Sequence, residues 1–416
     1  MMRTRLPNAA KVAATLLAGT ASGCISFTGP ASALRPVPRD SLPRWQTCDS
    51  APHCTAEVRL TYLGVAGFLI RAGTEAVMTA PSFTHPSIWA VATPFWPIHS
   101  DSQTVDHELR RLLGKDTAVL GSVSAILVGH SHYDHLMDVP LLARRYAPHA
   151  RIYGSLTTKR TLMGDSSMRA RAGQIDSLAP ADSVIATPWR VGRWIYSPGR
   201  RLRIMAMRSS HAPNWWFVTL APCHERSDRT SLPRTGWGWC LGEPLSYIID
   251  LLDDVGQPAF RIFYQDAASR PLDVVLPPFA RPDQHGVDLA IVCAGNFKKV
   301  PDYPTLLLAA LRPKHVIVGH WEDFFHPQGD APSPVRLTDT RELAARLDAL
   351  GAGKWVALTP GGAVEVRYYG TARPSSNVRR HYLGERTRHE ADRNPDIRGG
   401  GLEVADRVRA QRRLSR

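Results

Sequence analysis

Three histidines and one aspartate lie within six residues of one another in this chain: His130, His132, Asp134 and His135. They directly follow the apolar run 125–128, which has the composition of a buried strand. A tight loop at the end of a strand can point several side chains into one cleft, and imidazole and carboxylate groups are the ligands that zinc, iron and manganese prefer. Burying so many polar groups without a shared partner would be costly. The segment therefore predicts a metal site rather than a polar surface loop.

The spacing of these four side chains resembles the signature motif of the metallo-β-lactamase fold hydrolases. In that family a distant His, a distant Asp and a last His follow the motif, each after a strand. The matching positions of this sequence are His211 after the run 203–207, Asp266 after 261–264, and His320 after 316–318. The resemblance covers about residues 57–370 and is strongest to the lactonase and N-acylphosphatidylethanolamine phospholipase D branch. It rests there on residues 132–135, on the pair His320-Trp321, and on the small residues after Asp266.

The resemblance implies a dinuclear metal site. The implied ligands are His130, His132 and His211 for one metal, Asp134, His135 and His320 for the other, and Asp266 as the bridge. Two Zn²⁺ ions are the expected occupants, with iron or manganese as alternatives. In such a site the cations lower the pKa of a shared water from about 15.7 to roughly 7, and the hydroxide attacks a carbonyl carbon or a phosphorus. Asp134 and Asp266 are the expected catalytic carboxylates, with Asp134 orienting the nucleophile and carrying its proton onward.

Three functions remain open at this point. The first is an exported hydrolase of phosphodiester or phospholipid-like substrates, the second is a lactonase, esterase or amidase on the same metals, and the third is a metal-binding scaffold without turnover. Trp215 and Trp216 follow His211 by four and five residues and would suit a small-molecule or lipid substrate with an apolar chain. In the other interpretation they cover apolar surface of their loop. Tyr133, inside the motif, either contacts substrate or packs.

The apolar runs predict the elements that position this site. Strands are expected at 58–63, 67–70, 76–78, 125–128, 203–207, 247–252, 261–264, 288–292 and 315–318, and helices from about 139, at 304–311 and at 342–350. The segments 355–358 and 364–368 are expected to form a hairpin around the turn Pro360-Gly361-Gly362. Strands come first and then alternate with helices, twice over. The sequence therefore predicts an α/β fold, an αββα sandwich of two mixed β-sheets with helices on the outer faces.

The ends of the chain differ in composition from its centre. Residues 1–24 combine basic, apolar and small residues as a signal peptide does, and they end in a segment that resembles a bacterial lipobox at Cys24, with 31–33 as a rival cleavage site. Residues 25–56 are interpreted as a tether, 57–370 as the hydrolase domain, and 371–416 as an Arg-rich, disordered tail. We therefore expect an exported bacterial protein that is periplasmic, secreted, or held to the membrane through a lipidated Cys24.

The net charge of +14 is concentrated at those ends. Residues 1–24 contribute +3 and residues 371–416 contribute +6, which leaves +5 for the rest of the chain. A core that is only mildly cationic predicts no nucleic-acid partner. No apolar run approaches about 18 residues, so no transmembrane helix is expected.

The six cysteines agree with export. Cys48 and Cys54 are close neighbours in sequence, and Cys223 and Cys240 bracket a polar loop, as in disulfide-bonded secreted proteins. These four cysteines allow three connectivities, of which nearest-neighbour pairing is the simplest. Cys293 lies in an apolar run and is expected to be a small buried hydrophobic residue.

Overall fold

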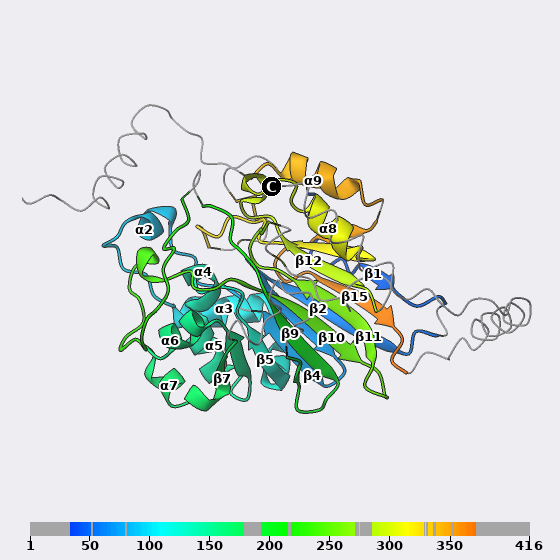
Figure 1. The fold of residues 1–416 in the computed structure, drawn as a ribbon, viewed down its shortest axis with the longest axis horizontal. Helices are drawn as coiled ribbons and strands as arrows, with labels where there is room; N and C mark the ends of the chain where they lie inside the picture. The colour runs from blue at the N-terminus through cyan, green and yellow to red at the C-terminus, as the bar shows by residue number, and fades with distance from the viewer. Residues whose placement is uncertain are drawn as a thin grey trace, which may run out of the picture. The chain divides into compact units, whose positions relative to one another are not determined.

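Two β-sheets form the centre of the computed structural model (Figure 1). The structure describes residues 34–371, apart from 51–52, 80, 179–192, 215–217, 271–273, 275–284, 328, 330–331, 336–337 and 352. The strand order is β1-β15-β2-β3-β4-β5-β6-β7 in the eight-stranded sheet and β14-β13-β12-β11-β10-β9-β8 in the seven-stranded sheet. Each sheet is mixed, with an antiparallel portion followed by a run of parallel strands.

The eight-stranded sheet comprises β1 (Arg44–Gln46), β2 (Ala56–Gly64), β3 (Gly67–Ala72), β4 (Glu75–Thr79), β5 (Val123–Leu127), β6 (Arg151–Gly154), β7 (Ile175–Ser177) and β15 (Ala363–Tyr368). Strands β2, β3 and β4 lie where the sequence predicted strands and form an antiparallel meander. Strands β4 to β7 then run parallel to one another. The site motif follows β5, at the carboxyl end of a central parallel strand, where open α/β sheets commonly place their ligands.

The seven-stranded sheet comprises β8 (Ile195–Tyr196), β9 (Leu202–Arg208), β10 (Leu245–Leu252), β11 (Pro258–Tyr264), β12 (Leu289–Cys293), β13 (His315–Gly319) and β14 (Trp355–Ala357). Strands β8 to β11 are antiparallel, and β11 to β14 are parallel. Every residue of β10 and β12 is buried, as expected for central strands covered on both faces.

The main hydrophobic core lies between the two sheets. It joins side chains of β2 and β3, such as Tyr62 and Phe68, to side chains of β10 and β11, such as Ile248 and Phe263. Leucines of α8 (Thr305–Leu311) and α9 (Thr340–Asp348) belong to the same cluster. Apolar residues on alternate strand positions therefore drive the two sheets together, because burial of apolar surface is the dominant favourable term in folding.

A second core covers the outer face of the eight-stranded sheet. It joins strand residues such as Ile126 and Ile152 to helix residues such as Val105, Leu109 and Leu142. The helices on this side are α2 (Ile88–Ala92), α3 (Ser102–Leu113), α4 (Tyr133–Leu136), α5 (Val139–Arg145), α6 (Leu156–Leu162) and α7 (Ser166–Arg169). Short 3-10 helices are η2 (Gly114–Ser122), η3 (Ala172–Gln174), η4 (Gly236–Gly238) and η7 (Phe297–Lys299). The predicted fold class is confirmed: two mixed sheets pack face to face with helices outside (Figure 1).

The predicted hairpin around Pro360-Gly361-Gly362 is wrong. Strand β14 pairs with β13 in one sheet, whereas β15 pairs with β2 in the other, so the turn carries the chain from sheet to sheet. The turn is already bonded to β2, because Gly361 N donates to Tyr62 O at 2.7 Å and Tyr62 N donates to Gly362 O at 2.9 Å. These bonds begin the pairing of β15 with β2, whereas β14 pairs only with its parallel neighbour β13 among the described strands.

The described part of the predicted tether contributes to the sheet. Strand β1 pairs in parallel with β15, and Leu34 is buried in the central core. Both nearest-neighbour disulfides are confirmed, since Cys48 is bonded to Cys54 and Cys223 to Cys240. Cys293 is a buried free thiol, as predicted.

Among the described residues, no helix is long and apolar enough to cross a membrane.

Candidate metal centre

The motif loop leaves β5 after Leu127 and turns into the four-residue helix α4. Gly129 opens this loop beside the Asp266 carboxylate. A Cβ atom on residue 129 would lie 2.1 Å from Asp266 Oδ2 and 2.3 Å from its Cγ, closer than van der Waals contact allows. The absence of a side chain at Gly129 is therefore what lets the loop and Asp266 approach each other.

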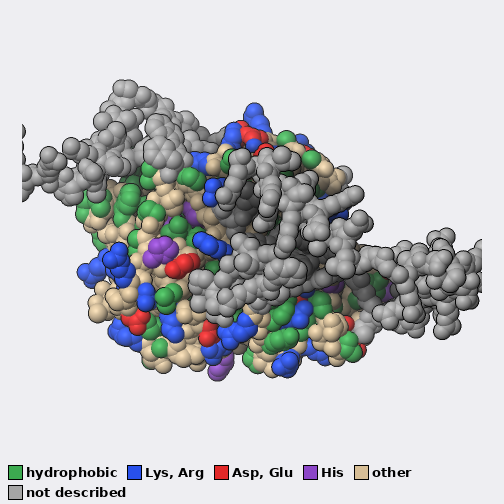
Figure 2. Space-filling model, viewed as in Figure 1, with side chains coloured by type: hydrophobic (Ala, Val, Ile, Leu, Met, Phe, Trp, Pro, Cys, Tyr) green, Lys and Arg blue, Asp and Glu red, His purple; other side chains and the backbone are tan. Residues whose placement is uncertain are grey.

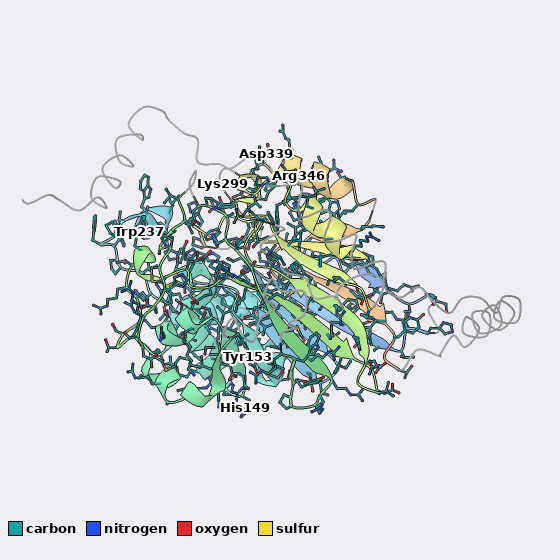
Figure 3. The ribbon with its side chains drawn as sticks, in the orientation of Figure 1. His149, Tyr153, Trp237, Lys299, Asp339 and Arg346 are labelled. Atoms are coloured by element: carbon teal, nitrogen blue, oxygen red, sulfur yellow. A yellow bond between two sulfur atoms is a disulfide. The ribbon has the colours of Figure 1, made fainter. Side chains whose placement is uncertain are left out.

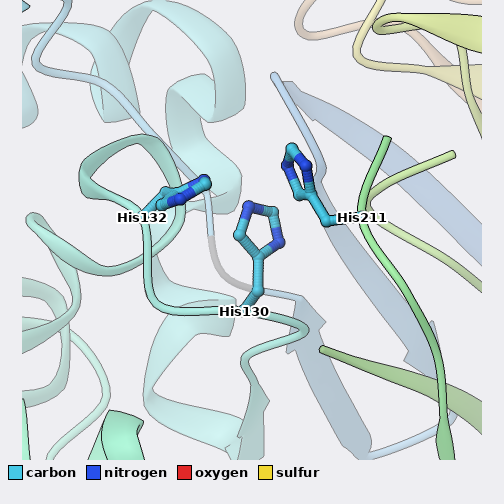
Figure 4. A group of neighbouring side chains, drawn as sticks. All are labelled: His130, His132 and His211. Carbon is cyan, nitrogen blue, oxygen red and sulfur yellow. The ribbon is translucent and has the colours of Figure 1, made fainter. Parts of the chain in front are cut away.

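All seven residues implied as ligands converge in one place. Three groups of side chains offer ligand atoms that lie within 4.8 Å of one another: His130, His132 and His211; His130, His135 and Asp266; and Asp134, His135 and His320. Figure 4 shows the first group, with the rings of His132 and His211 on either side of His130. The four loops that supply these residues follow β5, β9, β11 and β13. Six of the seven residues are buried, and His211 is partly buried.

Asp266 lies between the first and last groups. Its Oδ1 is 3.2 Å from His130 Nδ1, and its Oδ2 is 3.6 Å from His135 Nδ1. Asp134 Oδ2 is 3.4 Å from both His135 Nε2 and His320 Nε2. One carboxylate thus faces the shared centre of the cluster, and the other faces the His135–His320 side.

Several buried polar atoms of this cluster are not hydrogen-bonded. His130 Nδ1 and Nε2, His135 Nδ1, His320 Nδ1 and Asp266 Oδ2 make no hydrogen bond within the protein. Native proteins rarely leave buried polar groups unsatisfied, and each such group needs an explanation such as an ion. Five such atoms on imidazole and carboxylate groups match the donor set that divalent zinc, iron and manganese prefer. The residues therefore fit a metal centre.

Two of the imidazoles are oriented by backbone carbonyls. His132 Nε2 donates to Leu220 O at 2.8 Å, and His211 Nδ1 donates to Ala212 O at 2.5 Å. A ring nitrogen that donates must carry the proton, so the lone pair of neutral His132 is on Nδ1 and that of neutral His211 is on Nε2. Metal-binding histidines commonly have such an outer partner, which fixes the tautomer and the ring orientation.

The electrostatics keep three of the imidazoles neutral. Burial lowers the pKa of His132 and of His211 to about 3, and burial with the nearby His135 and His211 holds the pKa of His130 well below its ordinary value. Burial alone would raise the pKa of Asp134, but His135 and His320 outweigh it and lower that pKa strongly. Neutral imidazoles offer lone pairs, so the protein presents these rings in the state that a metal requires.

The pKa values of Asp266 and His135 are both raised, for different reasons. It raises the pKa of Asp266 above the ordinary carboxyl value. Burial would lower the pKa of His135, but the Asp134 carboxylate outweighs it and raises that pKa. In the metal-free protein, His135 and Asp134 therefore favour each other's charged form.

His320 is held by a buried hydrogen-bond network that was not expected from the sequence. Its backbone is left-handed, with φ of 55°, and its N donates to Tyr62 Oη at 2.9 Å. The Tyr62 hydroxyl donates in turn to Glu322, whose carboxylate also accepts from Val65 N. Glu322 is fully buried. Tyr62 and Glu322 thus support the strained backbone of His320, although neither has ligand-like spacing in the sequence.

The remaining candidates from the sequence are Tyr133, Trp215 and Trp216. Tyr133 is buried in the hydrophobic core on the outer face of the eight-stranded sheet, and this favours packing over substrate contact. Trp215 and Trp216 lie outside the described residues. Their suggested role at the entry therefore stays a prediction.

Other aromatic side chains form an exposed surface beside α2. Trp89, Phe95 and Trp96 are 51%, 79% and 54% exposed, and Trp237 is 37% exposed. Trp237, labelled in Figure 3, donates from Nε1 to Ala92 O at 2.9 Å, which joins η4 to α2. Figure 2 shows hydrophobic side chains gathered over the α2 end of this face, whereas Lys and Arg lie at several separate places. We call Trp89, Phe95, Trp96 and Trp237 the aromatic surface.

Comparison with known proteins finds similarity only to solved structures. No family model matches the chain, and no curated protein matches it. The metallo hydrolase Igni18 from the archaeon Ignicoccus hospitalis is 14% identical, covers 74% of this chain and 98% of its own, and has a TM-score of 0.43. The metallo-β-lactamase fold protein YhfI from Bacillus subtilis is 11% identical, with coverages of 75% and 100% and a TM-score of 0.41. The diiron β-hydroxylase CmlA from Streptomyces venezuelae is 13% identical, with coverages of 75% and 54% and a TM-score of 0.41.

Proposed function

We propose that this protein is a metal-dependent hydrolase of the metallo-β-lactamase superfamily with two metals per chain. The observation that carries the proposal is the buried cluster of five histidines and two aspartates, in which five polar atoms make no hydrogen bond within the protein. His130, His132 and His211 would hold one metal, Asp134, His135 and His320 would hold the other, and Asp266 would bridge. Zn²⁺ suits the predominance of imidazole ligands, and iron or manganese could take the same donors.

The chain's own residues prepare the site for hydrolysis. When bound, two divalent cations supply Lewis acidity and lower the pKa of a coordinated water. The backbone carbonyls of Leu220 and Ala212 hold the rings of His132 and His211 in one tautomer. Asp134, whose pKa is held low, stays ionised at neutral pH and is the group that we assign to orient the attacking water and accept its proton.

We propose a phosphodiester or phospholipid-like molecule as the substrate. The support is the aromatic surface, which lies on segments linked to the metal centre. The loop that carries Trp237 also carries Leu220, which bonds His132. The segment before Trp89 is bonded to the chain just after α4, because Asp138, the residue before α5, accepts from Phe83 N and Thr84 N at 2.8 Å each. Exposed aromatic rings next to a metal site suit a substrate with an apolar chain.

A panel of three substrates tests this function. Zinc-loaded protein is assayed with bis(p-nitrophenyl) phosphate, a γ-lactone and a p-nitrophenyl acyl ester, beside an Asp266→Ala variant. We expect turnover of the phosphodiester and its near-complete loss in Asp266→Ala, with the far-ultraviolet circular dichroism unchanged. Turnover of the lactone or ester alone would instead support the lactonase, esterase or amidase function. Two bound metals with no turnover of any substrate would support the scaffold.

We further propose that the chain is exported and lipidated at Cys24. The support from the described residues is the pair of disulfides, which persist in oxidising compartments and are rare in the cytosol. Labelling of cells with a radioactive or clickable fatty acid should mark the wild-type protein and leave Cys24→Ala unlabelled. A mature protein that begins at Leu34 and carries no lipid would show that the rival cleavage site is used.

A further inference from the structure

The loop that covers His132 is fastened to the motif loop by backbone hydrogen bonds. Ser131 N donates to Leu241 O at 3.0 Å, and Leu241 N donates to Ala221 O at 2.9 Å. These hydrogen bonds link the motif loop to Leu241, and Leu241 in turn to Ala221, the residue after Leu220. Leu220 O is the acceptor that orients the His132 ring.

A disulfide closes this arrangement at the same place. Cys223 and Cys240 are bonded; Cys240 directly precedes Leu241, and Cys223 lies two residues after Ala221. Gly242 N also donates to Cys223 O at 3.0 Å, so the disulfide and two backbone hydrogen bonds join residues 221–223 to residues 240–242. Leu220 is three residues from Cys223, and its freedom to move is set by this closure.

We propose that the Cys223–Cys240 disulfide is a positioning element of the metal centre, which holds the Leu220 carbonyl against His132 Nε2. The bond fixes the proton on Nε2 and leaves Nδ1 for the metal. Without the disulfide, residues 220–223 can separate from residues 240–242, and the His132 ring loses its fixed tautomer and orientation. This inference rests on the proposed metal centre only for its functional consequence, since the hydrogen bond itself exists in the metal-free protein.

A second contact on the same segment gives an independent handle. Leu220 N donates to Asn214 Oδ1 at 2.8 Å, so the Asn214 side chain holds Leu220 from the other side. Asn214 is exposed, so Asn214→Ala should remove this support at little cost to the core. It should weaken the positioning of His132 in the same direction as loss of the disulfide, but to a smaller extent.

The chain supplies a matched control. The Cys48–Cys54 disulfide closes a loop between β1 and β2 and packs with Tyr369. Its removal by Cys48→Ser and Cys54→Ser should lower thermal stability without reaching the metal centre. The test variant carries Cys223→Ser and Cys240→Ser. Both are compared with the parent and with Asn214→Ala.

The first readout is metal affinity, measured by cobalt(II) titration of metal-free protein with the visible d–d spectrum and a competing chelator. The parent should take up two equivalents. The Cys223/Cys240 variant should bind one of them about 10- to 100-fold more weakly, the cost typical of losing an outer partner of a metal-binding histidine. Asn214→Ala should show a smaller loss, and the Cys48/Cys54 variant should bind as the parent does. Equal affinity in the Cys223/Cys240 variant and the parent, or equal losses in both disulfide variants, would overturn the proposal.

The second readout needs no metal. In ¹H–¹⁵N spectra of metal-free protein, the His132 Nε2–H bonded to a carbonyl should be protected from exchange in the parent and absent in the Cys223/Cys240 variant. If the parent binds no metal, the proposed function fails, and this signal alone decides the positioning role. If the Cys223/Cys240 variant does not fold, Asn214→Ala carries the same test, and an unchanged signal and cobalt affinity there would reject the role of the Leu220 segment.

Discussion

A single methyl group placed at Gly129 should disable the metal centre. In Gly129→Ala the new Cβ would lie 2.1 Å from Asp266 Oδ2, whereas Cβ contacts under 3.0 Å essentially do not occur. The carboxylate or the motif loop must therefore move by at least about 0.9 Å. Asp266 is buried and faces His130 and His135 at 3.2 and 3.6 Å, so the movement directly changes the distances between candidate ligands.

The size of the effect follows from that displacement. A misplacement of about 1 Å in a reactive constellation can cost about 100-fold in rate, which is about 2.7 kcal/mol in the barrier. Overpacking a close contact also lowers stability by about 1–3 kcal/mol. We therefore expect kcat/KM to fall about 100-fold, the second equivalent of metal to be lost or weakened, and the melting temperature to fall by a few degrees.

The assay compares Gly129→Ala with Gly121→Ala. Gly121 has an ordinary backbone, and a Cβ added there meets no atom within 4 Å, so this variant makes the same chemical change without the contact. Metal content by elemental analysis, phosphodiester turnover and thermal unfolding are measured for both. If Gly129→Ala keeps two metals and turns over as Gly121→Ala does, Asp266 is not held where the structure places it or is not needed.

Three further predictions test other parts of the structure. Tyr62→Phe removes the hydroxyl that accepts from His320 N and donates to Glu322, so the free energy of unfolding measured in urea should fall by about 1–3 kcal/mol and metal binding should weaken. Wild-type values for both would mean that the network does not support His320. Chelation should lower the melting temperature by several degrees, because a ligand at about 1,000 times its Kd stabilises the folded protein by about 4 kcal/mol. Resupply of zinc should restore the melting temperature, and a melting temperature that does not change with metal would contradict the site. Burial, with nearby Lys314, lowers the pKa of His315 to about 4, below its value of about 6.5 in the unfolded chain, so His315 contributes stability that is lost as pH falls from about 6.5 to about 4. His315→Gln should therefore show a smaller drop in melting temperature between pH 7 and pH 5 than the wild type, and an equal drop would show that His315 is not the sensitive group.

The strands that carry the site were predictable because their apolar runs are long and buried. Residues 125–128, 261–264 and 315–318 correspond to β5, β11 and β13, within three residues at their ends. The connection between β14 and β15 was not predictable in the same way. Pro360-Gly361-Gly362 has the composition of a hairpin turn, and local chemistry alone does not reveal that Gly361 bonds to Tyr62, almost 300 residues earlier in the chain. Pairing across such a separation is decided by tertiary packing rather than by the turn.

In the candidate site, too, some residues could be predicted from the sequence and others depend on tertiary packing. Four residues of the cluster form a dense motif that is visible in the sequence, and the resemblance to a known family located His211, Asp266 and His320. The groups that hold these ligands in place do not show in the sequence. The partner of His132 is a main-chain oxygen, which every residue possesses, so no residue type at position 220 could have indicated it. Tyr62 and Glu322 are ordinary members of a strand and a loop until the fold brings them together under His320.

The disulfide beside His132 connects the compartment to the chemistry. A thiol pair at Cys223 and Cys240 would stay reduced in a cytosol that maintains free thiols, and the Leu220 segment would then lack its closure. In an oxidising compartment the bond forms and the carbonyl is held at 2.8 Å from His132 Nε2. On our proposal, one metal would therefore bind more tightly in an oxidising compartment than in a reducing one. On this reasoning the paired cysteines and the histidine motif, which lie apart in the sequence, act on the same metal centre. The two sheets bring the ligands together, and the disulfide-bonded loop orients one of them.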